Sequence, residues 1–139
     1  MRYRPFGATG TAVSNLTLKV GIEAVSRGPT EASELIYAAL EAGINAYCLE
    51  SADPVLAEVV GTALSNVDRK LLNVTVIVGR SVGRKASKNR AADQAFSGPG
   101  MTHAIDRALH ISGLGWLDVV LLDQPGEEEL PQSSLEALK

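Results

Sequence analysis

Residues 30–50, TEASELIYAALEAGINAYCLE, decide the fold because they contain a helix, its stop and a strand in direct succession. Thr30 is expected to cap the helix, with Glu31 favourable in the first turn. Gly43 is typical of a residue that ends a helix in the left-handed region. The apolar residues between them recur at helical spacing: Ala32, Leu35, Ile36, Ala39 and Leu40. Residues 44–49 follow as a strand.

Four segments have the composition of strands, and each is followed by a helical pattern. The strands are expected at 16–20, 44–49, 74–78 and 117–122. The third is β-branched throughout, which is typical of a strand buried on both faces. Strands that alternate with helices pair in parallel through right-handed crossovers. The sequence therefore predicts an α/β fold with four parallel strands.

The remaining helices are predicted from caps and apolar stripes. Asp53 before Pro54 is typical of a cap followed by proline at the first helical position. The stripe behind this pair consists of Leu56, Val59, Val60, Ala63 and Leu64. A third, shorter helix is expected around 105–109. Ser133 and Glu136 predict a capping box for a last helix that is incomplete.

A small hairpin is expected ahead of the first strand, because Gly7 and the pair Thr9-Gly10 favour a turn between two short extended runs. Residues 80–100 are expected to form the one long loop, which is rich in arginine and lysine up to residue 90. We expect a single domain over 1–139. It would consist of the hairpin, 1–14, and four βα units, 15–139.

Composition restricts the classes of function. The net charge of -3 gives no general reason to expect nucleic acid or an anionic membrane as a partner. The single cysteine, Cys48, excludes an internal disulfide and suits a reducing compartment. No apolar run approaches the roughly 20 residues needed to span a bilayer. We therefore expect a cytoplasmic protein that binds neither nucleic acid nor membranes.

Several segments, in chain order, resemble the aldo-keto reductase family. They are 1–10 with 13–14 (the opening hairpin), 31–36 and 39–45 (the first helix and second strand), 61–64 (the second helix) and 118–125 (the fourth strand). The resemblance implies a (β/α)8 barrel, a reduced nicotinamide cofactor, NADPH or NADH, and carbonyl substrates. Four βα units would make half of such a barrel of the TIM type.

The resemblance also implies an aspartate after the second strand and, a few residues later, a tyrosine that protonates the carbonyl oxygen as hydride arrives. Without gaps, Cys48 falls at the aspartate and Asp53 at the tyrosine. A shift of two residues instead makes Glu50 the carboxylate. Neither alignment supplies a tyrosine, since the chain has only Tyr3, Tyr37 and Tyr47.

The family's lysine and histidine are replaced as well. Arg80 stands at the lysine, or Ser81 if one residue is inserted, and Asp123 stands at the histidine. An arginine does not lose its proton at working pH, so it substitutes poorly for a lysine that tunes a pKa. A carboxylate would repel negative charge developing on a carbonyl oxygen. Thr17 and Lys19 occupy first-strand positions where the family has glycines.

The candidate pocket consists of residues at or near the C-terminal ends of the strands: Lys19, Cys48, Glu50, Asp53, Arg80, Ser81 and Asp123. The charged members could pair as a neutralised remnant of a site, form a pocket for a charged ligand, or lie at unrelated surface positions. Cys48 is expected to be buried and unreactive. No metal site is expected, because His103 and His110 are two helical turns apart.

Half a barrel would leave the edges of its first and fourth strands open, together with an apolar interior layer. We therefore expect a homodimer or a partner chain to cover it, unless the chain is a fragment of a longer protein. The resemblance implies that most residues that bind the cofactor come from the second half of the barrel. No cofactor is therefore expected for the isolated chain.

Two classes of function remain open. The first is a non-catalytic binding, regulatory or assembly module, favoured by the joint replacement of the tyrosine, lysine and histidine. The second is an NAD(P)H-dependent oxidoreductase, or a subunit of one, completed by a partner chain or by a C-terminal half. A decayed gene fragment with no selected function is a third possibility.

Overall fold

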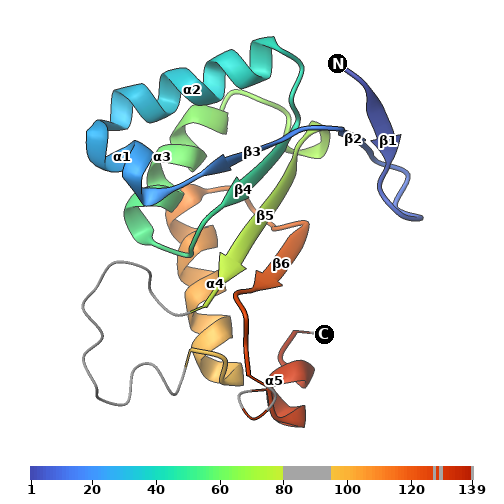
Figure 1. Cartoon of the computed structure of the whole chain (residues 1–139), viewed down its shortest axis with the longest axis vertical. Helices are drawn as coiled ribbons and strands as arrows, with labels where there is room; N and C mark the ends of the chain where they lie inside the picture. The colour runs from blue at the N-terminus through green and yellow to red at the C-terminus, as the bar shows by residue number, and fades with distance from the viewer. Residues whose placement is uncertain (80–94, 127, 129, 139) are drawn as a thin grey trace.

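The computed structural model describes residues 1–79, 95–126, 128 and 130–138 of the 139-residue chain. The elements, in chain order, are β1 (Tyr3–Pro5), β2 (Ala12–Ser14), β3 (Thr17–Val20), α1 (Ile22–Arg27), α2 (Pro29–Glu41), β4 (Ala46–Leu49), α3 (Pro54–Leu64), the 3-10 helix η1 (Arg69–Leu71), β5 (Asn73–Val78), α4 (Gly98–Ser112), β6 (Val119–Leu122) and α5 (Gln132–Glu136). The expected α/β fold, with a hairpin ahead of four parallel strands, is confirmed (Figure 1).

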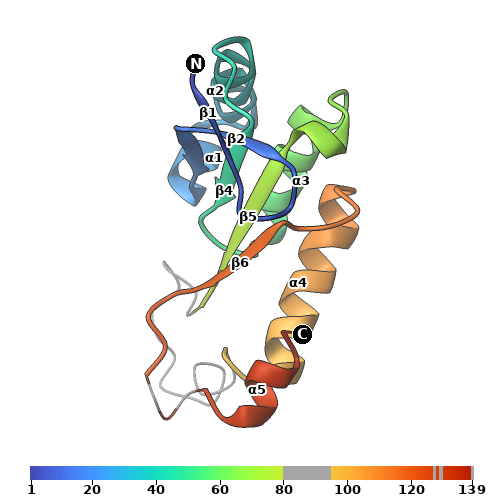
Figure 2. The same ribbon diagram turned by 90° about the vertical axis from the view of Figure 1, so that its right-hand side faces the viewer.

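The main sheet has the strand order β3-β4-β5-β6, and every neighbouring pair is parallel. The hairpin, β1 paired antiparallel with β2, forms a separate two-stranded sheet. Helices α2, α3 and α4 run along one side of the main sheet (Figure 2), and α3 packs against both of the others. The chain order therefore equals the strand order, as successive right-handed βα units require.

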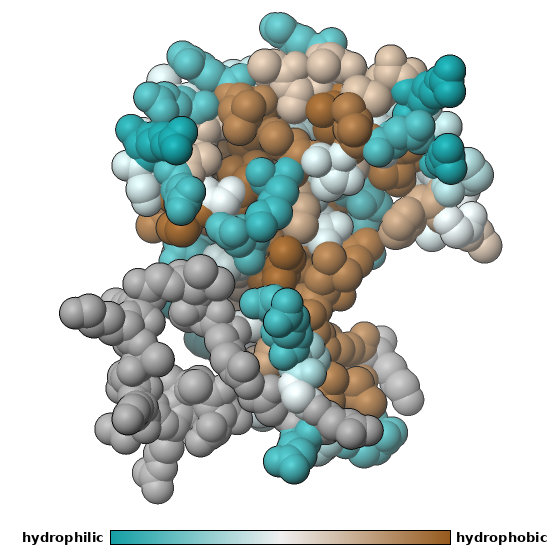
Figure 3. Space-filling model, viewed as in Figure 1, coloured by the Kyte–Doolittle hydropathy of each residue, from teal (hydrophilic) through white to brown (hydrophobic). Residues whose placement is uncertain are grey.

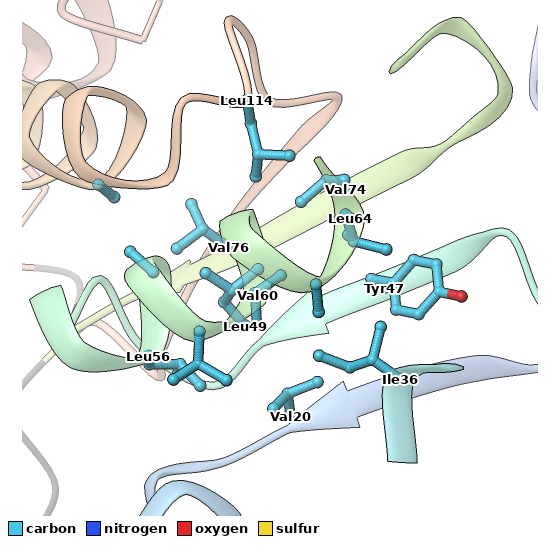
Figure 4. Close-up of a cluster of buried hydrophobic side chains, with 14 of the residues drawn as sticks. Val20, Ile36, Tyr47, Leu49, Leu56, Val60, Leu64, Val74, Val76 and Leu114 are labelled. Atoms are coloured by element: carbon cyan, nitrogen blue, oxygen red, sulfur yellow. The ribbon is translucent and has the colours of Figure 1, made fainter. Parts of the chain in front are cut away.

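The hydrophobic core lies between the sheet and these helices. Alternation along β4 and β5 directs Tyr47, Leu49, Val74 and Val76 toward the helices. Fully buried helix residues of the same core include Ile36, Leu56, Val60 and Leu64 (Figure 4). Burying each of these apolar side chains is worth roughly 2 kcal/mol relative to exposure.

The opposite face of the sheet is mixed rather than apolar, so the expected apolar interior layer is wrong. One row across it consists of Lys19, Cys48, Thr75 and Val119. Lys19 is exposed, whereas Cys48 and Thr75 are buried in the two central strands. A lysine and a threonine in this row remove part of the hydrophobic driving force that would cover the face.

The amino ends of the strands are fastened by side chains. Asn45 accepts a hydrogen bond from the Ser14 amide at 2.8 Å and donates to the carbonyls of Ala12 and Leu71. These bonds fix the hairpin to the base of the sheet. Among the described residues, no helix has the length and apolar character needed to cross a membrane.

A second fastening joins η1 to the start of β6. The Arg69 guanidinium donates to Asp118 and to the Trp116 carbonyl, both at 2.7 Å, and its carbon lies 4.5 Å from the Trp116 ring centroid. Asp118 also accepts from the Val74 amide at 2.7 Å. The cluster therefore holds β5 and β6 in register at their amino ends.

Some predicted helix starts differ from the structure. The expected cap at Thr30 is wrong, because α2 begins at Pro29 behind Gly28. Proline fits the first turn, since it lacks only an N–H that would stay unpaired there. Helix α1 was not expected at all. The expected capping box of Ser133 with Glu136 is also wrong, because Pro131 precedes α5 and Ser133 lies inside it.

The helix predicted around 105–109 is α4, and it is longer than expected. It begins at Gly98, where the Ser97 hydroxyl accepts a hydrogen bond from the Gly100 amide, and it runs for 15 residues. Its first turn occupies the end of the expected 80–100 loop. Most of that loop, 80–94, lies outside the described residues.

Candidate functional site

The C-terminal ends of the four parallel strands meet along one edge of the sheet, and charged residues gather there. Lys19 lies in β3, Glu50 follows β4 directly, and Asp123 follows β6 directly. Strand register places Lys19 opposite Cys48, one residue below the end of β3. This edge is where barrels built from βα units carry their sites.

Lys19 and Glu50 form an ion pair at this edge. The lysine Nζ lies 3.1 Å from Oε1 of Glu50, while Oε2 accepts a hydrogen bond from the Ile22 amide at 3.3 Å. These interactions hold the pKa of Glu50 below its ordinary value, with the Lys19 hydrogen bond the largest cause. The carboxylate is therefore ionised at neutral pH.

Gly21 makes room for the Glu50 carboxylate. A Cβ atom at this position would lie 2.6 Å from Oε2, closer than such atoms approach in folded proteins. The backbone can therefore turn from β3 into α1 beside the charge. Gly21 and Ile22 were missed by the sequence analysis, although a glycine directly after a strand is a usable indication of close approach.

Cys48 lies buried beside the ion pair. Its side chain is on the same face of the sheet as Lys19, and the residue is 8% exposed. Burial raises the pKa of the thiol; Lys19 opposes this effect and Glu50 adds to it. A protonated, buried thiol is a weak nucleophile.

Asp53 serves as the cap of α3. Its Oδ1 accepts hydrogen bonds from the amides of Val55 at 2.9 Å and Leu56 at 3.4 Å. Pro54 supplies the first helical residue, as the sequence predicts. Asp53 is the residue that the ungapped alignment places at the family's tyrosine. Its carboxylate is thus engaged by the N-terminus of α3.

Asp123 lies against the end of β5. Its amide donates to the Val78 carbonyl at 2.9 Å, and its Cβ lies 2.5 Å from where a side chain on Gly79 would begin. Arg80 and Ser81, the two candidates for the lysine position, lie outside the described residues. The structure therefore brings Lys19, Cys48 and Glu50 together, with Asp123 at the far end of the same edge.

All three tyrosines of the chain lie in the described part, away from these strand ends. The Tyr3 hydroxyl donates to the Gly43 carbonyl at 2.7 Å, beside the hairpin. Tyr37 is exposed on α2. The Tyr47 hydroxyl donates to the Ile44 carbonyl at 2.8 Å, and burial raises its pKa to about 12.

An open hollow of about 420 Å³ adjoins the ion pair, between the end of β3 and α1. Its walls carry charges of both signs, Lys19 and Arg27 against Glu23 and Glu50. Within the described ranges, no cluster of histidine, cysteine and carboxylate side chains is suited to hold a metal ion. The hollow therefore presents cationic and anionic groups side by side.

Structural comparison identifies the fold. No protein-family model matches the sequence, and no sequence match to a curated protein reaches significance. The aldo-keto reductase AKR11C1 from Bacillus halodurans, described as a holo form, superposes on 99% of this chain with a TM-score of 0.73 and 21% identity. This chain has the fold of the N-terminal half of an aldo-keto reductase. The family resemblance read from the sequence is thereby supported at the level of fold.

Two further solved structures resemble this chain. A Pseudomonas aeruginosa protein provisionally assigned as an aldo-keto reductase matches 98% of the chain with a TM-score of 0.70 and 25% identity. PA4992 of Pseudomonas aeruginosa, with the same provisional assignment, matches 98% with a TM-score of 0.68 and 25% identity. The half-barrel spans 45%, 53% and 55% of the three matched chains, about half of each.

Proposed function

We propose that this half-barrel is a non-catalytic binding, regulatory or assembly module with an aldo-keto reductase-like fold. The observation that carries the proposal is the position of Tyr3, Tyr37 and Tyr47. Reduction of a carbonyl by hydride needs a proton donor beside the carbonyl oxygen. Each of these hydroxyls lies elsewhere, and two of them are held by backbone carbonyls.

The ion pair supports the same proposal. Lys19 is engaged by Glu50, and the pKa of Glu50 is held below its ordinary value, so this carboxylate is not poised to exchange a proton near pH 7. Asp53 caps a helix. We propose the hollow beside α1, with Arg27 and Lys19 in its wall, as the place where a small charged ligand binds.

A second candidate is an NAD(P)H-dependent oxidoreductase, or a subunit of one. The Lys19–Glu50 pair favours it, since it keeps a lysine beside a carboxylate at the strand ends where the resembling family carries its acid. The likeness to a structure described as a holo form points the same way. The rest of such a site would come from a partner chain or from a C-terminal half.

Calorimetric titration of the 139-residue chain with NADPH and with NADH separates the two candidates. We expect no heat of binding with either cofactor, because the strands that supply most of the family's cofactor grip lie beyond the half-barrel. Saturable binding of either one favours the oxidoreductase candidate instead. In that case, the cofactor site is assigned to the hollow if Glu50→Gln abolishes binding. Glu58→Gln, a change on the exposed surface of α3, is the matched control and should retain binding.

A further inference from the structure

The two outer strands of the main sheet leave one edge each without a partner in the part of the chain that the structure describes. Among the described strands, β3 pairs only with β4, and β6 pairs only with β5. Large apolar residues are exposed at both edges: Leu16, just ahead of β3, is 59% exposed, and Leu121 in β6 is 47% exposed. Figure 3 shows apolar surface over the region where β6 lies. Open strand edges of this kind are pairing sites.

Two such sheets can close on each other because all strands run the same way. A half-turn that brings β6 of one copy beside β3 of a second copy makes a parallel junction. The same rotation brings the second β6 beside the first β3, so both junctions form together. A symmetric contact of this kind closes at two copies, and the result is a barrel of eight parallel strands.

The strand register fixes which residues would meet at each junction. Lys19, Cys48, Thr75 and Val119 are register partners in one row across β3, β4, β5 and β6. An eight-stranded barrel of this class closes with a shear of about eight residues, or about four for each half. Because of this shift, Val119 would pair with the residue four positions before Lys19 in the second copy, which is Asn15. Asp123, four residues after Val119, then lies opposite Lys19 of the second copy.

The direction of this shift is already present in the half-barrel. β3 and β4 end at Val20 and Leu49, which are register partners. β5 and β6 end two residues beyond the same row, at Val78 and Leu122. The C-terminal strand ends are therefore shifted by two residues between β3 and β6, in the same direction as the shift that closes the barrel.

The junction is complementary in charge and in hydrophobicity. By alternation, Asp123 and Lys19 point to the same inner face, where the lysine side chain is 58% exposed beside Glu50. On the helix side, the same register sets Val120 opposite Leu16 of the second copy, which covers that exposed leucine. The largely exposed Lys19 side chain and the open apolar edge are thus both covered in one arrangement.

We propose that two copies of this chain form a closed eight-stranded barrel, with β6 of each paired to β3 of the other and Asp123 of each facing Lys19 of the other. The proposal does not depend on whether the chain is catalytic. Sedimentation at micromolar concentration is expected to give twice the 14.6 kDa chain mass. A stable monomer under these conditions overturns the proposal.

A charge-reversal pair tests the junction itself. Lys19→Glu and Asp123→Lys each place like charges at both junctions of their own homodimer. Each is expected to weaken dimerisation at least about tenfold, since like-charge contacts at interfaces are costly. Mixing the two variants restores opposite charges at both junctions, so the mixture is expected to sediment as a dimer. Failure of the mixture to recover, when each variant retains native circular dichroism, overturns the proposed register.

Matched controls separate the junction from the fold. Lys70→Glu and Asp106→Lys make the same charge changes at exposed positions outside β3 and β6 and are expected to leave the dimer intact. Glu50→Gln removes the partner of Lys19 within the chain without reversing the junction charge. Dimerisation is expected to survive this change. A dimer that depends on Glu50 and ignores Asp123 would contradict the arrangement.

Discussion

At the residue scale, Lys19 and Glu50 form an ion pair at the C-terminal ends of β3 and β4. The resembling family carries its catalytic acid in this region. The lysine side chain is largely exposed, so the pair is partly screened by solvent. Its contribution to stability is therefore less than about 1 kcal/mol. Its consequence is chemical, because Lys19 holds the pKa of Glu50 below its ordinary value.

Replacing Lys19 by methionine is expected to raise the pKa of Glu50, since the lysine hydrogen bond is the largest cause of its lowering. The measurement is an NMR titration of the Glu50 carboxyl carbon. Lys70→Met, a change at an exposed lysine of η1, serves as the matched control and should leave that pKa in place. An unchanged Glu50 pKa in Lys19→Met would show that the ion pair is absent in solution.

The same pair gives a pH dependence with a defined sign. The folded-state pKa of Glu50 is depressed, so its stabilising contribution is present above the unfolded pKa near 4.5 and is lost as pH falls through the lower folded pKa. Wild type and Lys19→Met are expected to converge in unfolding free energy at the acid end of this window. A difference that persists well below it would have to arise from packing of the lysine stem.

Asp53 is a residue whose role is structural. Asp53→Ala leaves the amides of Val55 and Leu56 without their acceptor and is expected to cost about 1 kcal/mol in urea unfolding. Asp53→Asn keeps an acceptor oxygen and is expected to cost much less. Equal losses in the two variants would indicate that the charge matters and the cap does not.

Caps were predictable from the sequence where a second residue supported them. Asp53 was recognised because Pro54 follows it, and the structure has this cap. Thr30 and Ser133 were misassigned because a proline one or two residues earlier begins or precedes each helix. A threonine or serine is acceptable inside a first turn, so its presence alone does not locate the helix start.

At the scale of elements, the packing of α3 against α4 depends on one close approach. Gly61 lies in α3 and faces the backbone of Ser112 at the end of α4, so that a Cβ atom would overlap its carbonyl. The segment 61–64 belongs to the sequence resemblance, and this contact gives its glycine a physical reason. Residues of both helices belong to the same core.

Gly61→Ala is expected to force α3 and α4 apart and to cost roughly 1–3 kcal/mol, the range for overpacking a well-filled core. Chemical unfolding monitored by circular dichroism provides the measurement. Thr62→Ala, on the exposed side of the same helix, is the matched control and should stay near wild type. A stability gain in Gly61→Ala, as helix propensity alone predicts, would contradict the packing described.

The strands were predicted more closely than the helices. A β-branched run locates β5 to within one residue of its observed start, because few other structures accommodate it. Helix α1 was missed, since its six residues are too few to show a periodic stripe. The Arg69–Asp118 contact was also missed, because it joins residues 49 apart in the chain and sequence spacing carries no sign of it.

At the scale of the whole molecule, one face of the sheet is covered by helices and the other faces away from them. The strand order and the parallel pairing followed from alternation of strand and helix. The mixed character of the second face did not, because it depends on which residues become neighbours across strands. The pairing of Lys19 with Glu50 could be anticipated only as one of several possible charge pairings at the strand ends.

The claim that the half-barrel is not a reductase is tested most directly by steady-state turnover. The measurement is NADPH and NADH oxidation by the purified chain over a panel of aldehydes and ketones. We predict rates equal to those of buffer alone for every compound, since no tyrosine hydroxyl reaches the strand ends. A rate that scales with protein concentration and falls in Glu50→Gln, with Asp53→Asn as the unaffected control, would contradict the account.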